Sequence, residues 1–494
     1  MISLKAVRRA GVPLVAIETS DMQQTILNIT NEMNGKAKET PMLRWDVCRG
    51  LEGLNDEGKK FSNGYDAQAT QNPKDCLLIL ADNKLPERAI IFFENAHLYW
   101  KMEEVLQATW NLRDILKGIG ATLVMLCASV QLPAELKNDI ITLTDTLPDD
   151  AEVTIIVDSI LKDAKIKKVE DKEKIHDTLL GLSAFAAEQV LAMSIQKQDG
   201  ETNIDRVGLW ERKRKMIEQT PGLSVWRGGE TFKDIGGYEN VKSFMQSICK
   251  GNSAPRSIVF IDEIEKSMAG SQSDSSGVSQ DYLRCLLTWM QDKKAAGIVF
   301  IGISGSGKSA IAKATGNEAN IPTIAFDMGG MKNKFVGDSE GAIRTALQVV
   351  DAVSQGKCLF VTTCNSIGSL PPELRRRFSL GTFFFDIPDD KAKTKIWNIH
   401  LKKYGVTEKQ KASFPNDAGW TGAEIENCCN ISYRLNCTLT QAAKFIVPVT
   451  VSGKDRILQM SKDASGKYID ASKEGIYIYQ EKQNQANQSR KFEE

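Results

Sequence analysis

Eight residues, Gly-Ile-Ser-Gly-Ser-Gly-Lys-Ser from Gly302 to Ser309, constrain the fold of this chain more than any other stretch. They fit the pattern G-x-x-x-x-G-K-[ST], follow the apolar run Ile298–Ile301 and precede a helical stretch. Glycines let successive backbone N–H groups turn towards a phosphate, and the following helix N-terminus adds the positive end of its dipole. We expect Lys308 to reach the β- and γ-phosphates and Ser309 to ligate Mg²⁺. The alternative is an ordinary glycine-rich turn.

A second apolar run, Ser257–Ile261, ends in the two acids Asp262 and Glu263. A fully apolar strand is typical of a parallel sheet that is covered on both faces, and such sheets bind ligands at the carboxyl ends of their strands. Beside a phosphate loop, we expect Asp262 to hold Mg²⁺ through water and Glu263 to take a proton from the attacking water. Without a phosphate loop nearby, two acids after an apolar strand more often only mark the end of the strand and have no function in a site.

Three further signals agree with a nucleotide site. The apolar strand Cys358–Thr363 leads to Asn365, which is placed to orient the water from a neighbouring strand tip. Arg375 to Arg377 form a run that is usually a solvated face, but in a nucleotide-hydrolysing ring such arginines reach across a subunit boundary and stabilise the transferring phosphate. Phe335 stands in a short loop among glycine and charged residues, where a lone Phe is more often core than a substrate contact.

The composition argues against several classes of protein. Of the 494 residues, 42% are hydrophobic and 26% charged, with 63 basic and 63 acidic side chains, which disfavours wholesale disorder, a membrane bundle and a protein that coats nucleic acid. The ten Cys include no CxxC pair and there are only three His, so a disulfide framework or a His-rich metal site is not expected. No apolar run approaches the ~20 residues of a membrane span. We expect a soluble, cytoplasmic protein, or one of an organelle stroma if it is plastid-encoded.

The sequence divides into five segments. These are an α/β block over 1–200, a helix and linker over 201–231, a second α/β block over 232–390, a helical segment over 391–450 and an extension over 451–494 that is expected to be disordered from about 480. In the second block, strands are predicted near 257–261, 298–301, 321–326, 358–363 and 382–386. Residues 123–150 and 359–390 share the order strand, turn, Leu-Pro-x-Glu-Leu, strand, Pro-Asp-Asp. We interpret the first block as a degenerate copy of the second; chance similarity is the alternative.

Together these motifs resemble the AAA+ family of ATPases, over a stretch from Phe232 to Ile425. Within that family the chain is similar to the uncharacterised chloroplast and cyanobacterial open-reading-frame AAA proteins, whose first domain lacks a phosphate loop. The features that suggest this are Val15-Ala-Ile-Glu-Thr, Leu132-Pro-Ala-Glu-Leu, Gly181-Leu-Ser and Trp210-Glu-Arg-Lys-Arg. The resemblance implies an α/β fold: a parallel five-stranded P-loop core in strand order 5-1-4-3-2 with a small helical lid, preceded by a degenerate AAA-like α/β domain.

The resemblance also implies roles for individual residues. Lys308 and Ser309 correspond to Walker A, Asp262 and Glu263 to Walker B, and Asn365 to sensor 1. Arg375, Arg376 and Arg377 contain the arginine fingers, although three in a row leave open which of them faces the neighbour's γ-phosphate, and Phe335 matches the pore-loop aromatic of ring translocases. The implied contacts with ATP are made by Asp234, Ile235, Gly236, Gly237, Gly302, Ser304, Gly305, Ser306, Gly307, Lys308, Ser309, Gly422 and Ala423.

One departure from the family is large, because Walker A normally precedes Walker B, whereas here Asp262 and Glu263 come before Lys308. The strand and helix over about 257–296 are moved from their usual place in the chain. In a parallel sheet this unit can keep its position while its connections change, each new link skipping one strand and remaining right-handed. We therefore expect the spatial site to survive. The alternative is a sheet that assembles badly and binds nucleotide weakly.

Three functions remain open at this point. The first is an ATP-hydrolysing ring, such as a hexamer of identical chains, that remodels an unidentified protein substrate. The second is a nucleotide-gated switch or scaffold with incidental hydrolysis. The third, a nucleic-acid motor or clamp-loader relative, is disfavoured by the neutral charge. The first 200 residues lack a glycine loop and a Lys after their first strand, so they are expected to dock a partner or support the ring. The substrate, the pathway and the ring size do not follow from the sequence.

Overall fold

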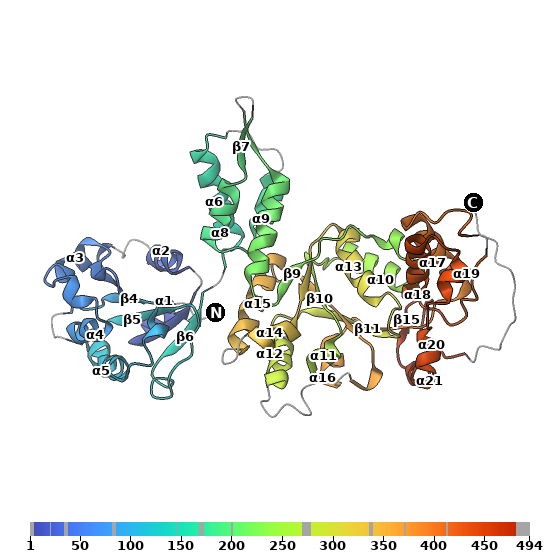
Figure 1. The fold of residues 1–494 in the computed structure, drawn as a ribbon. Helices are drawn as coiled ribbons and strands as arrows, with labels where there is room; N and C mark the ends of the chain where they lie inside the picture. Colours follow the sequence, from blue (N-terminus) through green and yellow to red (C-terminus); the bar gives the residue numbers. More distant parts are fainter. Residues whose placement is uncertain are drawn as a thin grey trace. The chain divides into compact units, whose positions relative to one another are not determined.

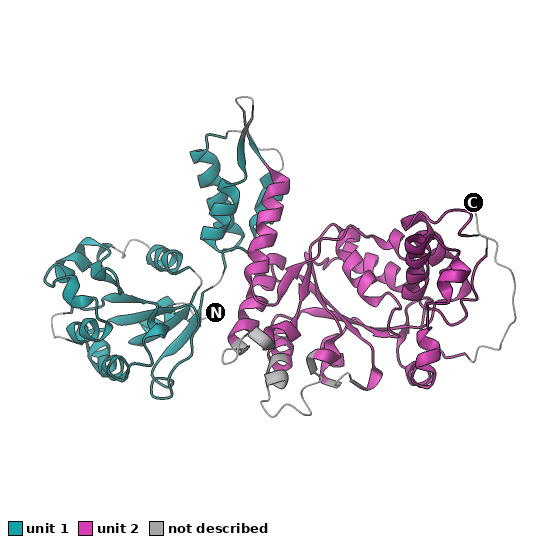
Figure 2. Cartoon of the chain, viewed as in Figure 1, with its two compact units in different colours: residues 1–204 teal, residues 205–494 magenta. Residues whose placement is uncertain are grey.

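The computed structural model describes the chain except for residues 1–3, 20, 34–37, 82–84, 146, 167–171, 199–200, 269–277, 335–338, 370–371, 412 and 481–494. The chain divides into two compact units, unit 1 over Met1–Ile204 and unit 2 over Asp205–Glu494 (Figure 2). In the described part of the chain, no helix combines the length and the apolar character that crossing a membrane requires.

Unit 1 is built on a sheet with the strand order β3-β2-β4-β5-β1-β6 (Figure 1). All neighbours pair in parallel except β3, which is antiparallel to β2. The strands are β1 (Leu14–Glu18), β2 (Met42–Asp46), β3 (Gly50–Gly53), β4 (Ile90–Glu94), β5 (Thr122–Cys127) and β6 (Ile141–Thr144). The helices around them are α1 (Leu4–Arg9), α2 (Met22–Glu32), α3 (Asp56–Ser62), α4 (Pro73–Ala81) and α5 (Glu103–Ile119).

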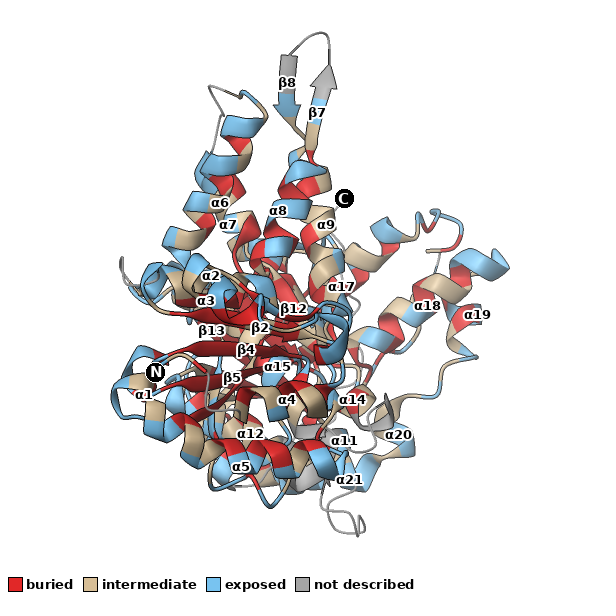
Figure 3. Ribbon diagram, turned by 90° about the vertical axis from the view of Figure 1, so that its left-hand side faces the viewer, coloured by how far each residue is buried: buried red, intermediate tan, exposed pale blue. Residues whose placement is uncertain are grey.

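The central strands of unit 1 are buried on both faces, as Figure 3 shows for β2, β4 and β5. Side chains alternate between the faces of a strand. Val15 and Ile17 therefore join one apolar cluster with residues of α1 and α2, whereas Leu14 and Ala16 join another with residues of α4 and α5. This two-sided cover explains why the strands read as continuous apolar runs.

After β6, unit 1 continues into a helical part. It consists of α6 (Asp150–Asp163), α7 (Lys172–Leu179), α8 (Ala184–Ala192) and the hairpin β7 (Ile195–Gln198) and β8 (Glu201–Ile204). Asp149 starts α6 with a capping box, because its carboxylate accepts from the Glu152 N–H while the Glu152 carboxylate accepts from the Asp149 N–H. Ser183 caps α8 with a single bond, because its hydroxyl oxygen accepts from the Ala186 N–H.

Unit 2 is built on a second sheet, with the strand order β15-β14-β11-β13-β10-β12-β9. All neighbours pair in parallel except β9, which is antiparallel to β12. The strands are β9 (Leu223–Val225), β10 (Ser257–Ile261), β11 (Ala296–Gly302), β12 (Thr323–Phe326), β13 (Cys358–Cys364), β14 (Thr382–Phe385) and β15 (Ile469–Asp470). The helices up to β14 are α9 (Arg206–Gln219), α10 (Glu239–Lys250), α11 (Ile264–Met268), α12 (Val278–Asp292), α13 (Lys308–Ala319), α14 (Met328–Lys334), α15 (Ser339–Ser354) and α16 (Pro372–Arg377).

The five strands predicted for unit 2 are all present. β14, β11, β13, β10 and β12 lie side by side and correspond to the expected strand order 5-1-4-3-2, although they follow one another differently along the chain. The link from β10 to β11 skips β13, and the link from β12 to β13 skips β10, as the rearranged order predicted. Two strands extend the five-stranded core. β9 lies where only a helix and a linker were predicted, and β15 lies in the segment described above as an extension.

Alternating apolar side chains again cover both faces of the unit 2 sheet. Ile258 and Phe260 of β10 pack with residues of α10 and α13. Val259 and Ile261 of the same strand pack on the opposite face with residues of α12 and α15. The carboxyl ends of β10, β11 and β13 therefore share one edge of a covered parallel sheet, which is where such folds bind ligands.

The segment after β14 is helical, with α17 (Asp390–Lys403), α18 (Gly422–Leu435), α19 (Leu439–Ala443), α20 (Val449–Ser452) and α21 (Lys454–Ala464). Trp397 and Trp420 lie in the apolar cluster of the lid, which α17, α18 and α19 form. The chain then returns to the sheet as β15, and the Tyr477 hydroxyl donates to Asp386 Oδ2 over 2.7 Å. This return segment covers the edge of β14.

The two units repeat one architecture. The strands of the two sheets can be matched one to one. The order β6-β1-β5-β4-β2 in unit 1 corresponds to the order β14-β11-β13-β10-β12 in unit 2. The related segments 123–150 and 359–390 occupy equivalent places, and each ends in an aspartate, Asp149 or Asp389, that caps the next helix. Unit 1 thus repeats the strand order of unit 2.

Candidate functional site

The glycine-rich loop lies between β11 and α13, as its sequence predicted. Gly302 has φ +149°, and a Cβ there would lie 2.2 Å from the Phe385 carbonyl oxygen, so only glycine fits. Gly307 has φ +90° and is the N-cap residue of α13. Because glycine offers no capping side chain, the first N–H groups of α13 remain directed at the loop, where an anion binds well.

Lys308 is buried beneath this loop. Its ammonium donates to the carbonyl oxygens of Gly302 over 2.9 Å and Ile303 over 2.7 Å, so the side chain folds back under the loop. Burial lowers the pKa of Lys308 from 10.5 to about 8, and the nearby acids, Glu265 foremost, oppose that shift. Ser306 is also buried and donates to the Ile303 carbonyl over 2.7 Å, whereas Ser304 is exposed.

The loop and the acidic strand end meet in space. The Ser309 hydroxyl donates to Asp262 Oδ1 over 2.8 Å, although Asp262 belongs to the strand that comes earlier in the chain. One hydroxyl and one carboxylate oxygen at this spacing suit a magnesium ion that takes its other ligands from water and phosphates. The two residues expected to hold Mg²⁺ are therefore neighbours, and the donor set fits that ion.

Glu263 lies beside Asn365 at the tips of the adjacent strands β10 and β13. The Asn365 amide donates to Glu263 Oε1 over 2.8 Å, and Lys266 forms an ion pair with Glu263 Oε2. Glu263 has φ +45°, in the left-handed region that non-glycine residues rarely adopt. The carboxylate of the expected base is thus held by one side chain beyond the end of β13 and one on α11.

Sequence reasoning missed two residues that join these strand ends. Thr363 is buried, and its hydroxyl bonds both the Glu263 N–H and the Asp262 carboxylate. Glu265 accepts from the Asn365 N–H over 2.9 Å. A signal for Thr363 was available, because residues two apart on a strand share a face and Thr363 precedes Asn365 by two. Glu265 has no such signal, since its contact spans 100 positions.

The segment over residues 234–237, which is expected to contact ATP, packs on the lid. A Cβ on Gly236 would lie 2.7 Å from the Ile396 nitrogen, and one on Gly237, whose φ is +80°, would lie 2.9 Å from the Ala392 Cβ. Ile235 is half-buried beside them. Asp234 instead accepts from the Thr231 N–H over 2.8 Å, a bond that lowers the pKa of its carboxyl group. The structure therefore shows Asp234 as a cap of its own turn.

The lid reaches the phosphate loop directly. The Ala423 N–H, in the first turn of α18, donates to the Gly305 carbonyl over 3.2 Å. Gly305 has φ +78°, and a Cβ there would lie 3.1 Å from the Ala423 Cβ. Gly422 is next to this contact, with its Cβ position 3.8 Å from the Gly305 oxygen. Both predicted lid residues thus lie beside the loop.

The three arginines stand on α16, and the described contacts of two of them are with residues outside the loop. Arg375 lies near Tyr468, where its charge opposes the rise in the Tyr468 pKa that burial causes. Arg377 donates to the side chain of Gln291 on α12. Arg376 is exposed. The predicted pore-loop residue Phe335 lies outside the described residues.

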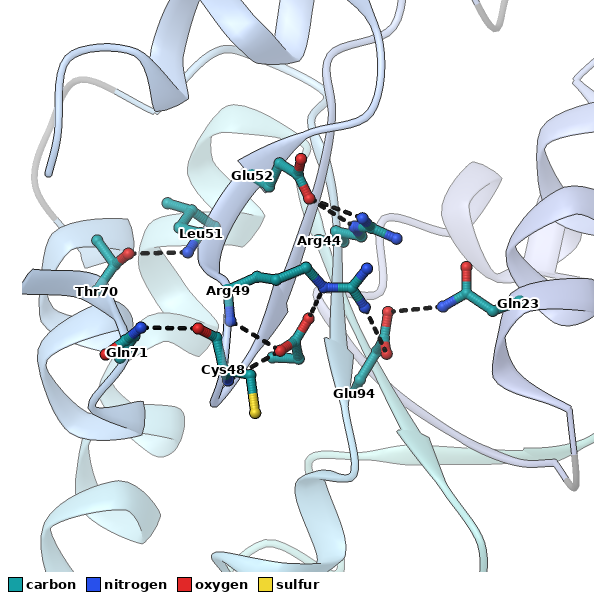
Figure 4. Close-up of polar contacts among 10 residues, drawn as sticks. Gln23, Arg44, Cys48, Arg49, Leu51, Glu52, Thr70, Gln71 and Glu94 are labelled. Atoms are coloured by element: carbon teal, nitrogen blue, oxygen red, sulfur yellow. Dashed lines mark hydrogen bonds and ion pairs between the residues drawn. The ribbon is translucent and has the colours of Figure 1, made fainter. Parts of the chain in front are cut away.

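Unit 1 has a different set of side chains at the equivalent edge of its sheet. Glu94 is the last residue of β4, and Asp262 directly follows β10. The residue after each acid, Asn95 or Glu263, has a positive φ, +56° and +45° respectively. Gln23 donates to Glu94 over 3.3 Å and Arg49 lies 4.0 Å from it (Figure 4). Burial raises the pKa of Glu94, and the charge of Arg49 opposes this. Asp21 caps α2 with its own carboxylate, at the place where unit 2 has its glycine loop.

Two families of known proteins match the chain, one in each unit. Residues 2–144 match the family described as the SpoVK-like AAA ATPase N-terminal domain. Residues 229–304 and 298–355 match the AAA family, ATPases associated with various cellular activities. The second match comes in two stretches, in keeping with the altered order of the segments in this chain.

Curated relatives cover most of the chain at low identity. An uncharacterised AAA domain-containing protein, ycf46 of Gracilaria tenuistipitata var. liui, is 24% identical over 433 residues, which are 78% of this chain and 82% of the relative. The protein of the same description from Guillardia theta is 22% identical and covers 94% of this chain and 95% of its own length. The chain therefore combines a SpoVK-like AAA ATPase N-terminal domain with an AAA domain, and over most of its length it is similar to the ycf46 AAA proteins.

Proposed function

We propose that this protein binds ATP with Mg²⁺, hydrolyses it, and works as a ring of identical subunits that remodels a protein substrate. The observation that carries the nucleotide part is the hydrogen bond between Ser309 and Asp262, because it joins the phosphate loop to an acid whose order in the chain is reversed. The match of residues 229–304 and 298–355 to the AAA family supports the same activity.

In this proposal each residue has one task. Lys308 and the loop N–H groups bind the phosphates, and Ser309 and Asp262 hold Mg²⁺, which when bound neutralises phosphate charge. Glu263 accepts the proton of the attacking water, and Asn365 keeps the Glu263 carboxylate oriented through their 2.8 Å hydrogen bond. Gly236, Gly237, Gly422 and Ala423 surround the nucleoside. The arginines of α16 act on the nucleotide of a neighbouring subunit.

The first test is an ATPase assay on the purified protein with Mg²⁺, with Glu263→Gln as the inactive reference. Electron microscopy with and without a slowly hydrolysed ATP analogue then tests the ring. ATPase activity that a protein substrate stimulates, and that Phe335→Ala reduces, would support remodelling. Nucleotide-dependent assembly without such stimulation would favour a switch or scaffold, and a salt-sensitive shift of DNA or RNA would favour a nucleic-acid motor.

A further inference from the structure

The hydroxyl of Thr363 connects both acids of the candidate site. Thr363 stands near the end of β13, and its side chain is buried, with 1% of the residue exposed. Its Oγ1 lies 2.8 Å from the Glu263 nitrogen and 2.6 Å from Asp262 Oδ1. One side-chain atom of β13 therefore contacts both Asp262, the expected Mg²⁺ ligand, and the backbone of Glu263, the expected base.

The chemistry of the three groups fixes the direction of both hydrogen bonds. A backbone N–H can only donate, so the Thr363 oxygen accepts from Glu263. An ionised carboxylate can only accept, so the single hydroxyl proton of Thr363 goes to Asp262. Ser309 donates to the same Asp262 oxygen over 2.8 Å. One donor from β13 and one from the first turn of α13 thus restrict the rotation of the Asp262 carboxylate.

The same hydroxyl supports the unusual backbone at Glu263. Residues with a left-handed backbone persist at functional sites only where their surroundings hold them, and Glu263 has φ +45°. The Thr363 oxygen accepts from the Glu263 N–H. Asn365, two residues after Thr363, donates to the Glu263 carboxylate. Without the hydroxyl, a part-buried N–H donor would lose its acceptor.

We propose that Thr363 is a positioning residue for ATP hydrolysis, whose one hydroxyl orients Asp262 towards Mg²⁺ and Glu263 towards the attacking water. This inference rests on the proposed ATPase function. In this chain β10 and β13 are paired strands separated by about a hundred residues, and beyond their last paired residues the side chains of Thr363 and Asn365 connect them.

The test compares substitutions at two neighbouring positions of one strand. Thr363→Val keeps the shape and removes the hydroxyl, and Thr363→Ser keeps the hydroxyl. Thr362→Val is the matched control, because Thr362 is equally buried but its hydroxyl donates to the Ile261 carbonyl over 3.2 Å. Two quantities are measured for each protein: the Mg²⁺ concentration that half-saturates binding of a fluorescent ATP analogue, and kcat for ATP hydrolysis.

For Thr363→Val, the half-saturating Mg²⁺ concentration should rise and kcat should fall, each by roughly tenfold or more, because a hydrogen bond to a charged group is lost. Binding of the analogue without Mg²⁺ should stay within about threefold of the original protein, and both Thr363→Ser and Thr362→Val should resemble the original. Thr363→Ala, which removes the same hydroxyl with less bulk, should repeat the Thr363→Val result even if the valine disturbs folding.

Three outcomes would overturn the role of Thr363: unchanged Mg²⁺ dependence and kcat in Thr363→Val, an equal loss in Thr362→Val, or no recovery in Thr363→Ser. Each of these leaves ATP hydrolysis by the original protein intact and so sinks this inference alone. If the original protein neither binds the analogue in a Mg²⁺-dependent way nor hydrolyses ATP, the proposed function fails and takes the inference with it.

Discussion

The Ser309 hydroxyl lies 2.8 Å from the Asp262 carboxylate, across a separation of 47 positions in which the acid comes first. In the AAA+ family that the sequence resembles, the residues that correspond to Ser309 and Asp262 occur in the opposite order. The carboxyl ends of parallel strands lie at the same edge of the sheet whichever strand comes first in the chain, because each strand needs only its neighbours and a covering helix.

Replacing Lys308 with Ala should abolish detectable ATP binding, because the loop from Gly302 to Ser309 loses its only cation. Isothermal titration calorimetry measures the affinity directly. Lys313→Ala is the control, since Lys313 belongs to the same helix but its ammonium stacks on Trp226, 4.4 Å from the ring centre. An unaltered affinity in Lys308→Ala would remove the basis for the phosphate-loop assignment.

The substitution Glu263→Gln should leave ATP binding nearly intact and slow hydrolysis by about 10²–10⁴-fold, because the amide cannot take the proton of the attacking water. Single-turnover assays with a saturating excess of enzyme separate this effect from binding. Glu239→Gln, at an exposed carboxylate that pairs with Lys395, serves as the control. Near-normal turnover in Glu263→Gln would mean that the base lies elsewhere.

Neutralising Arg375, Arg376 and Arg377 together should preserve ATP binding and reduce hydrolysis by ~10³-fold or more, if they act on the nucleotide of a neighbouring subunit. Mixing this variant with Lys308→Ala should restore part of the activity, because one subunit then supplies the loop and the other the arginines. Since Arg377 bonds Gln291, thermal unfolding of the variant is measured in parallel. Equal activity per subunit in a dilute, monomeric sample and a concentrated one would argue against a ring mechanism.

The affinity for ATP should fall as the pH rises through about 8. Burial lowers the pKa of Lys308 to about 8 in the nucleotide-free protein, so its ammonium is charged below that pH and neutral above it. Bound phosphates favour the charged form, and binding above pH 8 therefore takes up a proton and weakens by up to about tenfold per pH unit. Calorimetry in buffers of different ionisation enthalpy measures the proton. A constant affinity between pH 7 and 9.5 in the original protein, with the same flat profile in Lys313→Ala, would contradict the burial argument.

Replacing Tyr477 with Phe should lower the free energy of unfolding of unit 2 by about 1–3 kcal/mol, because Asp386 loses a hydroxyl donor at 2.7 Å. Burial raises the pKa of Tyr477, so the hydroxyl keeps its proton throughout the physiological range. Urea denaturation followed by fluorescence measures the change. Tyr433→Phe, at an exposed position of α18, should change stability far less; equal effects would show that the Asp386 contact contributes nothing specific.

Local sequence determined the elements of this protein. The strands at 257–261, 298–301 and 358–363 were predictable because a covered parallel strand must be apolar throughout, and the loop from Gly302 to Ser309 was predictable because phosphate binding needs glycines and a Lys at fixed spacing. The Pro-Asp-Asp segments at 148–150 and 388–390 were recognised only as part of a repeat, and the structure shows that the second residue of each is a helix N-cap. The roles of Phe335 and of the arginines of α16 stay predictions.

Tertiary structure decided how these elements are joined. β9 and β15 have three and two residues and carry no periodic pattern, so only their pairing with β12 and β14 makes them strands. The contacts of Asp262 with Ser309 and of Thr363 with both acids depend on which strands become neighbours. That choice is set by packing between residues far apart in the chain, where no local pattern records it. The sequence therefore determined which side chains could form the site, and the strand order determined which of them meet.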